Sequence, residues 1–396
     1  MSTPALELAD IFRLHGPAYR QAHRLPLPQH RLMQAIENCR TPALGGVVEW
    51  CDRCQFTHIQ YRSCRNRHCP KCQGEARAQW LQQRQAELLP VEYFHVVFTL
   101  PEPIANIAFY NKKAVYSILF RAAAETLLEI AADPKRLGVE IGFFAILHSW
   151  GQNLHFHPHL HCVVPGGGLA RHGKRWIHGR RRFLLPVRVL SARFRRRFLQ
   201  ALQSVYEQGQ LQFFGEQENL RDPPSFARFL APLEKVAWVV YAQPPFGGPQ
   251  HVLEYLSRYT HRVAISNHRL LHMENGQVSF RWKDYRDRQH PDKVMTVAVD
   301  EFIRLFLQHT LPTGFQRIRY YGYLANSHRI GKLELCRALL ATASSDLLPT
   351  LSACCQRAAE LRDVDRSRCP RCGVGELSRY LLPPPWRSGW APPDTS

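Results

Sequence analysis

A chain of 396 residues, 45% of them hydrophobic, is long enough to build two or three domains with cores of their own. The 52 Lys and Arg residues against 32 Asp and Glu residues leave a net charge of +20, which favours a polyanionic partner, nucleic acid before an acidic membrane. No apolar run is long enough to span a bilayer, and the N-terminal stretch lacks the apolar segment of a signal peptide. We therefore expect a cytoplasmic protein with no membrane partner, in which close spacing among the 12 cysteines indicates metal binding rather than disulfides.

The pattern of apolar and turn-forming residues predicts helices and strands that interleave along the chain. We expect one or two short helices in residues 1–40, and longer helices at 74–89, 111–132, 191–209 and 225–231. Strands are expected at 91–101, 140–148, 235–243 and 314–324, hairpins at 166–187 and 269–286, a helix passing into a strand at 251–266, and a strand followed by a helix at 295–312. This order predicts an α+β fold.

Three regions follow from this reading. Residues 1–89 hold N-terminal helices and a cysteine-rich segment, residues 90–330 form the mixed core, and residues 331–396 are a helical C-terminal region. We expect the tail to be disordered after residue 380, because it is rich in proline.

The segment "CDRCQFTHIQYRSCRNRHCPKC" carries two C-x-x-C pairs, Cys51–Cys54 and Cys69–Cys72. Four thiolates at this spacing predict a closed, structural zinc site, since a catalytic zinc would need an open position. Cys64 and His68 are spare candidates, so the ligand set is not unique. The positive charge of the surrounding arginines suits contact of this module with DNA; they are Arg53, Arg62, Arg65 and Arg67. The alternative is a zinc module that only folds the N-terminus or binds another protein.

A lone "CPRCG" places Cys369 and Cys372 near the C-terminus. Half a zinc site of this kind needs two more ligands, for which Cys354 and Cys355 are weak candidates. It remains a candidate second zinc site.

Histidines recur at every second residue in "HFHPHLHCVVPGGG", at positions 155, 157, 159 and 161. Alternate residues of a strand share one face, so His159 and His161 are near enough to bind one ion, whereas His157 and His161 are too far apart. Pro158 indicates that the first half of this segment is a loop or an edge. The alternative is a polar strand face in contact with water.

Tyr255 and Tyr259 in "HVLEYLSRYTHRVAIS" are four residues apart, so on a helix both project from the same face. Two aromatic residues at this spacing are, taken alone, more often part of an amphipathic stripe. Tyr320, Tyr321 and Tyr323 either stack on bases or pack a strand, and we favour packing. The arginine-rich stretches near 171–183 and at 193–198 are expected to follow a nucleic-acid backbone.

Taken together, these blocks resemble the two-tyrosine, HUH-superfamily rolling-circle transposases of bacterial insertion sequences, the IS91 group, with their N-terminal transposase zinc-binding domain. The resemblance rests on "SCRNRHCPKCQ", "FHVVFTLP", "GQNLHFHPHLHCVVPGGG", "YLSRYTHRVAISN" and "LPTGFQRIRYYGYLAN", and it extends from about residue 10 to residue 340. It implies an HUH-type antiparallel sheet with flanking helices, with His159 and His161 binding Mg²⁺ or Mn²⁺. The third ligand is not identified; Gln152 and Asn153 are near in sequence.

The resemblance also implies the chemistry. Tyr255 and Tyr259 are the expected nucleophiles, in unknown order, for nicking and rejoining single-stranded DNA at element ends and target through a 5′-phosphotyrosine. The sequence contains no G-x-x-x-x-G-K-[ST] motif, so a helicase or other replication machinery would come from the bacterial host, at the nucleoid. The oligomeric state stays open.

Three alternatives remain at this point. A replication initiator or relaxase would use the same nicking chemistry in a different biological process. A zinc-containing DNA-binding regulator would leave both tyrosines inert. A metal-dependent hydrolase would turn over phosphoesters without a covalent intermediate.

Overall fold

The structure is a computed structural model that describes residues 6–85, 87–180, 184–243, 263–285, 287, 289–342 and 368–385. Helices and strands interleave along these residues, and the paired strands in them run antiparallel. The predicted α+β class is therefore confirmed.

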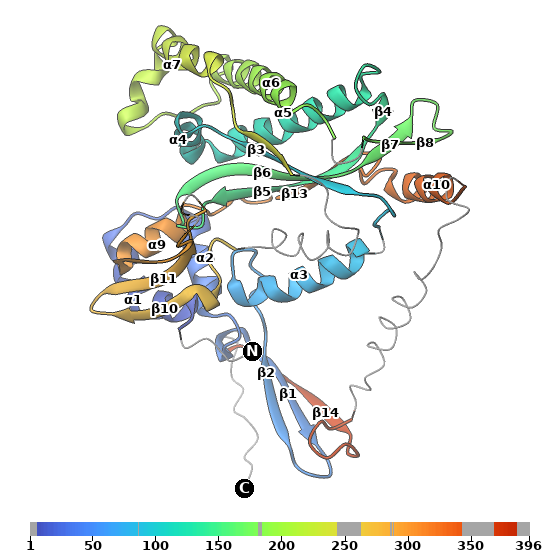
Figure 1. The fold of residues 1–396 in the computed structure, drawn as a ribbon. Coiled ribbons are helices and arrows are strands. Elements are labelled where there is room, and N and C mark those ends of the chain that lie inside the picture. Colours follow the sequence, from blue (N-terminus) through green and yellow to red (C-terminus); the bar gives the residue numbers. More distant parts are fainter. Residues whose placement is uncertain are drawn as a thin grey trace.

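A five-stranded sheet in the order β13-β5-β6-β3-β9 forms the centre of the molecule (Figure 1). Its strands are β3 (Tyr93–Thr99), β5 (Gly142–Trp150), β6 (Phe156–Pro165), β9 (Val240–Gln243) and β13 (Ile318–Gly322). β6 lies between β5 and β3, and from His159 onward it pairs with both of them, so this part of the histidine-rich segment is an inner strand.

The prediction that the first half of that segment is a loop or an edge is confirmed in part: His155 precedes β6, and the register with β3 begins only at His159, although residues 156–158 belong to β6 and are next to β5 at a β-bulge. His148 pairs with His159 and Trp150 pairs with Phe156, so two residues of β6, one of them Pro158, lie opposite one residue of β5. A bulge tolerates the missing N–H of proline because its extra residue is outside the regular ladder.

One face of the central sheet is covered by four helices, α4 (Glu102–Tyr110), α5 (Lys112–Ala132), α6 (Val187–Glu207) and α7 (Pro223–Lys235), with the 3₁₀ turn η2 (Gly215–Arg221) before α7 (Figure 1). Alternate strand residues such as Phe98 and Leu160 pack there, with Phe98 4.9 Å from the ring of Phe194 on α6. The predicted helix 111–132 corresponds closely to α5, because its amphipathic pattern is local.

The opposite face of the sheet is covered by α3 (Pro70–Gln85) and α10 (Arg329–Thr342). Trp80 of α3 packs edge-on against Phe144 of β5, with ring centroids 5.6 Å apart. Tyr323 is fully buried over Gly142, where a Cβ would lie 2.5 Å from its ring, so this tyrosine packs the core as favoured from the sequence.

A second core joins the N-terminal helices to residues more than 250 positions away in the chain. Here α1 (Leu8–Ala22) and α2 (Leu27–Glu37) pack with α9 (Val299–Leu307) and with a sheet of β10 (Leu270–Glu274), β11 (Gln277–Lys283) and β12 (Asp292–Ala298), which η3 (Asn267–Arg269) precedes. Phe12 and Phe306 meet at 5.6 Å. The predicted hairpin turn is confirmed, since Asn275 and Gly276 both have positive φ, as a type I′ turn requires.

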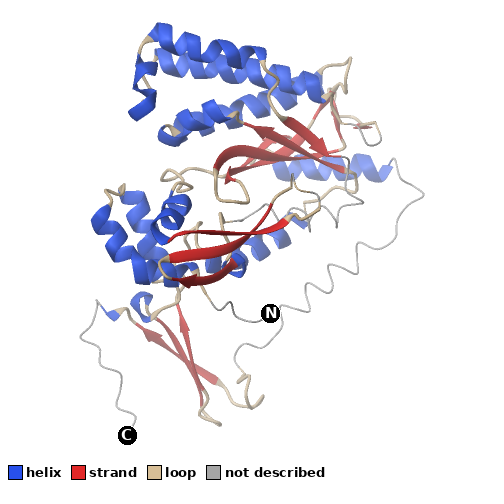
Figure 2. Cartoon of the chain, turned by 60° about the vertical axis from the view of Figure 1, so that its left-hand side comes forward, coloured by secondary structure: helices blue, strands red, loops and turns tan. Residues whose placement is uncertain are grey.

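Two small sheets complete the described chain (Figure 2). One is formed by β4 (Val139–Glu140), β7 (Gly167–Ala170) and β8 (Trp176–His178). The other, here called the terminal ribbon, has the order β14-β1-β2 and is formed by β1 (Gly46–Cys51), β2 (Thr57–Tyr61) and β14 (Leu377–Leu382), with η1 (Pro42–Leu44) before β1.

The terminal ribbon corrects the expectation of disorder after residue 380. Tyr380, Leu381 and Leu382 belong to β14 and pair with Val48, Val47 and Gly46 of β1. The proline-rich composition gave no sign of this strand, because its partner lies more than 300 residues away in the chain.

Candidate metal centres

Three histidines come together where β5 and β6 pair on the sheet face opposite α5 and α6. His148 of β5 lies directly across from His159 of β6, and His161 is two residues further along the same face. One ring nitrogen from each histidine lies within 4.8 Å of those of the other two. The ring centroids are 4.4 Å apart for His148 and His161 and 4.8 Å for His159 and His161.

Hydrogen bonds orient two of these rings. The Nδ1–H of His159 donates to the carbonyl of His157 at 2.6 Å, which puts the lone pair of that ring on Nε2. Nδ1 of His161 is 2.8 Å from Nε2 of His95 on the neighbouring strand β3, and the two rings are nearly parallel. Such partners fix the tautomer and direction of an imidazole that binds a metal.

His148 was not singled out from the sequence. It lies at the end of the predicted strand 140–148, and the sequence carries no signal that this strand pairs in register with the histidine-rich one. Of the two amide residues near in sequence, Asn153 hydrogen-bonds His155, and the backbone carbonyl of Gln152 accepts from Arg269.

His309 lies fully buried beside this cluster. Its Nε2 is 2.9 Å from the carbonyl of Leu154, and its ring stacks on Phe156. Burial lowers the pKa of His309 to about 3, so the ring is neutral at physiological pH.

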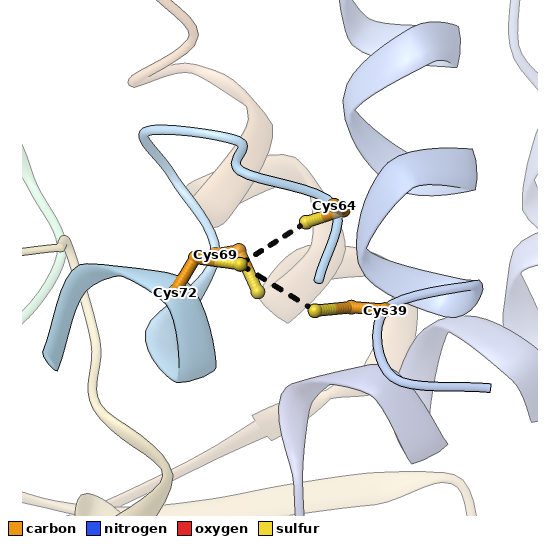
Figure 3. Close-up of side chains that lie close together, drawn as sticks. All are labelled: Cys39, Cys64, Cys69 and Cys72. Atoms are coloured by element: carbon orange, nitrogen blue, oxygen red, sulfur yellow. Dashed lines mark hydrogen bonds between the residues drawn. The ribbon is translucent and has the colours of Figure 1, made fainter. Parts of the chain in front are cut away.

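Eight cysteines form two clusters of four, each with its sulfur atoms within 4.8 Å of one another. The first, called the helix cluster, consists of Cys39, Cys64, Cys69 and Cys72 (Figure 3). Cys39 follows α2, Cys64 follows β2, and Cys69 and Cys72 lie at the N-terminus of α3, whose dipole favours thiolates. The Sγ atoms of Cys39 and Cys64 are each 3.5 Å from that of Cys72.

The second, called the ribbon cluster, consists of Cys51, Cys54, Cys369 and Cys372. The Sγ atoms of Cys51 and Cys372 are 3.8 Å apart, and those of Cys54 and Cys369 are 3.6 Å apart. Each cluster therefore has the ligand number and type of a closed zinc site.

These clusters change the predicted ligand set. Cys51–Cys54 and Cys69–Cys72 do not share a site, because each pair completes a different cluster. The spare candidate Cys64 belongs to the helix cluster, which also includes Cys39, a residue that the sequence analysis missed. Cys354 and Cys355 lie outside the described residues.

The other spare candidate, His68, belongs to neither cluster; it is buried, and its Nε2 accepts from the backbone N–H of Leu311 at 3.3 Å. Burial lowers its pKa well below the usual value. His68 therefore packs the protein as a neutral ring.

A groove of about 1340 Å³ opens beside α5. Its basic residues are Arg24, Lys112, Lys113, Arg121 and Arg319, and none of the described residues that line it is acidic. Half-exposed Tyr110 and Phe214, which also line it, are neighbours with ring centroids 5.2 Å apart and ring planes tilted by 55°. Two of its lining residues, Lys112 and Phe109, contact the ring of Phe156, three residues before His159.

The arginines predicted at 193–198 lie on α6, on the sheet face that α5 also covers, and Arg193 and Arg197 form ion pairs with Glu129 of α5. Of the other predicted basic stretch, residues 181–183 lie outside the described residues, as do Tyr255 and Tyr259.

An antiparallel sheet with a histidine cluster, together with two cysteine clusters of the zinc-binding type, defines a metal-binding protein of the α+β class. Two family models match this chain: "Putative transposase" over residues 142–330 and "Transposase zinc-binding domain" over residues 11–100. No solved structure matches it.

Two curated proteins are similar over most of their length. "Putative transposase y4qJ" of Sinorhizobium fredii is 57% identical over 387 residues, 95% of each chain. "Transposase for insertion sequence element IS801" of Pseudomonas savastanoi pv. phaseolicola is 30% identical over 348 residues, 85% of this chain and 80% of that protein. The chain belongs to the IS91 family of insertion-sequence transposases, as the resemblance implied. No helix of the described residues is long and apolar enough to cross a membrane.

Proposed function

We propose that this transposase nicks and rejoins single-stranded DNA at the ends of its mobile element through a 5′-phosphotyrosine, in rolling-circle transposition. The observation that carries the proposal is the convergence of His148, His159 and His161 from two paired strands. Three imidazoles, two of them buried, suit a site that binds a divalent ion and a phosphodiester.

The donor set decides which ion fits. Imidazole nitrogen is a better ligand for transition metals than for Mg²⁺, which prefers oxygen. Of the two ions that the sequence predicts, Mn²⁺ therefore suits three histidines better. When bound, the ion would polarise the non-bridging oxygens of the scissile phosphate.

The protein residues orient this site. His157 and His95 hold the rings of His159 and His161 through Nδ1, so that both present Nε2. His148 and His161 are buried, which limits water around the reacting phosphate. We infer that His148 is the third ligand.

Tyr255 and Tyr259, proposed from the sequence and the family resemblance, are the nucleophiles. The phenolic oxygen of one tyrosine forms a bond to phosphorus, and the bond from phosphorus to the 3′-oxygen breaks. The tyrosine loses its proton, and the leaving 3′-oxygen gains one. One phosphodiester replaces another, so rejoining needs no external energy source, and the second tyrosine permits a further cleavage while the first link persists.

We infer that the groove beside α5 guides the DNA strand. Its cations would neutralise phosphates, and Tyr110 and Phe214 offer rings for base stacking. Phe109 and Lys112 of the groove contact Phe156, so a DNA strand that leaves the groove at these residues would approach the start of β6. A host helicase would separate the two DNA strands, and the protein would therefore act at the bacterial chromosome.

The proposal is tested by cleavage of an end-labelled single strand that carries the element end, with Mn²⁺ added. The wild type should cleave the strand, whereas His159→Ala and His161→Ala should not. Equal cleavage by these variants would exclude the histidine cluster from the reaction. Binding without cleavage by the wild type would instead favour a regulator.

A further inference from the structure

We propose that the ribbon cluster, Cys51, Cys54, Cys369 and Cys372, binds a structural zinc ion of its own and thereby fastens the C-terminal strand β14 to the N-terminal part of the chain. The helix cluster binds a separate zinc ion. The matched zinc-binding model ends at residue 100, so it includes neither Cys369 nor Cys372. The inference does not depend on how the DNA is cleaved.

The sulfur positions fit a tetrahedral ion. Zinc–sulfur bonds of about 2.3 Å set a tetrahedral edge of about 3.8 Å. The two sulfur–sulfur distances between the N-terminal and the C-terminal C-x-x-C loops match that edge: 3.8 Å for Cys51–Cys372 and 3.6 Å for Cys54–Cys369. Each pair joins residues more than 300 positions apart, so the match is not a product of local sequence.

The two C-x-x-C loops also share a backbone conformation. In each loop, the N–H of the residue after the second cysteine donates to the carbonyl of the first, from Gln55 to Cys51 at 3.1 Å and from Gly373 to Cys369 at 2.9 Å. Gln55 and Gly373 both have positive φ, at 55° and 71°. The N–H of the first cysteine is also bonded within its own loop, to the carbonyl of Phe56 or Gly375. Two similar loops facing each other form a built site rather than a chance grouping.

Gly375 permits this close approach. A Cβ at this position would lie 2.4 Å from Sγ of Cys51 and 2.9 Å from Oδ1 of Asp52. The N–H of Gly375 donates to Sγ of Cys372 at 3.3 Å, and the N–H of Glu376 donates to Oδ1 of Asp52 at 3.1 Å. The C-terminal loop is therefore shaped around the sulfur of the N-terminal one.

The terminal ribbon has little else to stabilise it. β2 and β14 are largely exposed, and Leu381 and Tyr380 of β14 are 70% and 58% exposed. Of the residues in its three strands, only Gly46 and Cys51 are buried. A three-stranded sheet without a hydrophobic face is marginal in water, so the metal would supply the stability that a core supplies elsewhere.

The two cysteine clusters become complete at different stages of synthesis of the chain. The helix cluster is complete once residue 72 has been synthesised, whereas the ribbon cluster requires residue 372. The terminal ribbon can therefore close only when nearly the whole chain exists.

The test measures zinc per chain in the full-length protein by elemental analysis. The wild type should hold two zinc ions, and the double variant Cys369→Ser/Cys372→Ser should hold one. Cys39→Ser/Cys64→Ser should also lose one ion, while Cys336→Ala, a buried cysteine outside both clusters, should keep two. Cobalt(II) bound to Cys39→Ser/Cys64→Ser should show the absorption of a tetrahedral thiolate site.

A second variant keeps every thiol. Gly375→Ala should reduce the zinc content from two ions to one and increase hydrogen exchange at the amides of β14. Its matched control is Gly331→Ala on α10, where a Cβ meets nothing within 4 Å, and this variant should behave as the wild type.

Two results of these measurements, and a third from the state of the cysteines, would overturn the proposal. One is a wild type with a single zinc ion that only Cys39→Ser/Cys64→Ser removes. The other is a reduced, zinc-loaded protein in which chelation or Gly375→Ala leaves exchange in β14 unchanged. Disulfides among the four ribbon cysteines in protein purified under reducing conditions would equally contradict it.

Discussion

The hydrogen bond between His95 and His161 gives a quantitative test of the histidine cluster. His95→Phe keeps a planar ring of similar size but removes the nitrogen that lies 2.8 Å from Nδ1 of His161. His95 is only 3% exposed, so water cannot readily replace the lost partner. Removing such a partner weakens metal binding by about 10- to 100-fold, or about 1.4–2.7 kcal/mol, and burial places the expected effect in the upper part of that range.

The assay is the Mn²⁺ concentration that gives half-maximal cleavage of a labelled single strand. It should rise by about 10- to 100-fold in His95→Phe, with cleavage restored at saturating Mn²⁺. His95→Gln, which can still hydrogen-bond, should lie between this variant and the wild type. The control is His272→Phe in the separate β10–β12 sheet. An unchanged Mn²⁺ requirement in a folded His95→Phe protein would refute the orienting role of His95.

Three further predictions concern the cluster, the groove and its surroundings. His148→Ala should weaken Mn²⁺ binding by more than His95→Phe does, measured by calorimetric titration; equal affinity to the wild type would exclude His148 as a ligand. Lys113→Glu and Arg121→Glu in the groove should each lower the affinity for single-stranded DNA and reduce the slope of log affinity against log salt concentration by at least about 0.7. Arg193→Ala on α6 should leave the affinity and the slope nearly unchanged. If all three variants had equal effects, the DNA path would be assigned to α6 instead. The pKa of His309 is about 3 in the folded protein and about 6.5 in the unfolded chain, so the unfolded chain binds more protons between these pH values, and the free energy of unfolding should fall as the pH falls from about 6.5 to about 3. His309→Gln should flatten this pH dependence, measured by denaturant unfolding. An equally steep pH dependence in His309→Gln would contradict the assignment.

Local patterns predicted most elements of the fold. The helix at 111–132 and the hairpin around Asn275 and Gly276 could be read from periodicity and turn residues, because both depend on neighbours in sequence. The helix predicted at 74–89 exists but begins at Pro70, inside the cysteine-rich segment, where proline at the first helical position favours initiation.

Long-range pairing could not be read in this way. His159 and His161 stand out through their spacing on one strand, but His148 joins them only through the register of β5 against β6. Cys369 and Cys372 lacked partners in the sequence for the same reason, since theirs are on a strand at the other end of the chain.

Cysteine counting held one unused signal. The N-terminal segment has six cysteines, Cys39 to Cys72, and the C-terminal "CPRCG" has two, so together they supply the thiolates of two closed zinc sites. If four of the six N-terminal cysteines bind one zinc ion, two remain, and the spacing alone allows several choices of which two. Only the structure assigns Cys51 and Cys54 to the C-terminal pair.

The central claim is tested most directly by trapping the covalent product. Purified wild type, Tyr255→Phe, Tyr259→Phe and the double variant are incubated with a labelled single strand carrying the element end, with and without Mn²⁺, and separated on a denaturing protein gel. The account predicts a Mn²⁺-dependent labelled protein band that the double variant lacks, with the DNA joined through its 5′-phosphate. A labelled band of equal intensity in the double variant, or cleavage of the strand with no covalent band in the wild type, would contradict it.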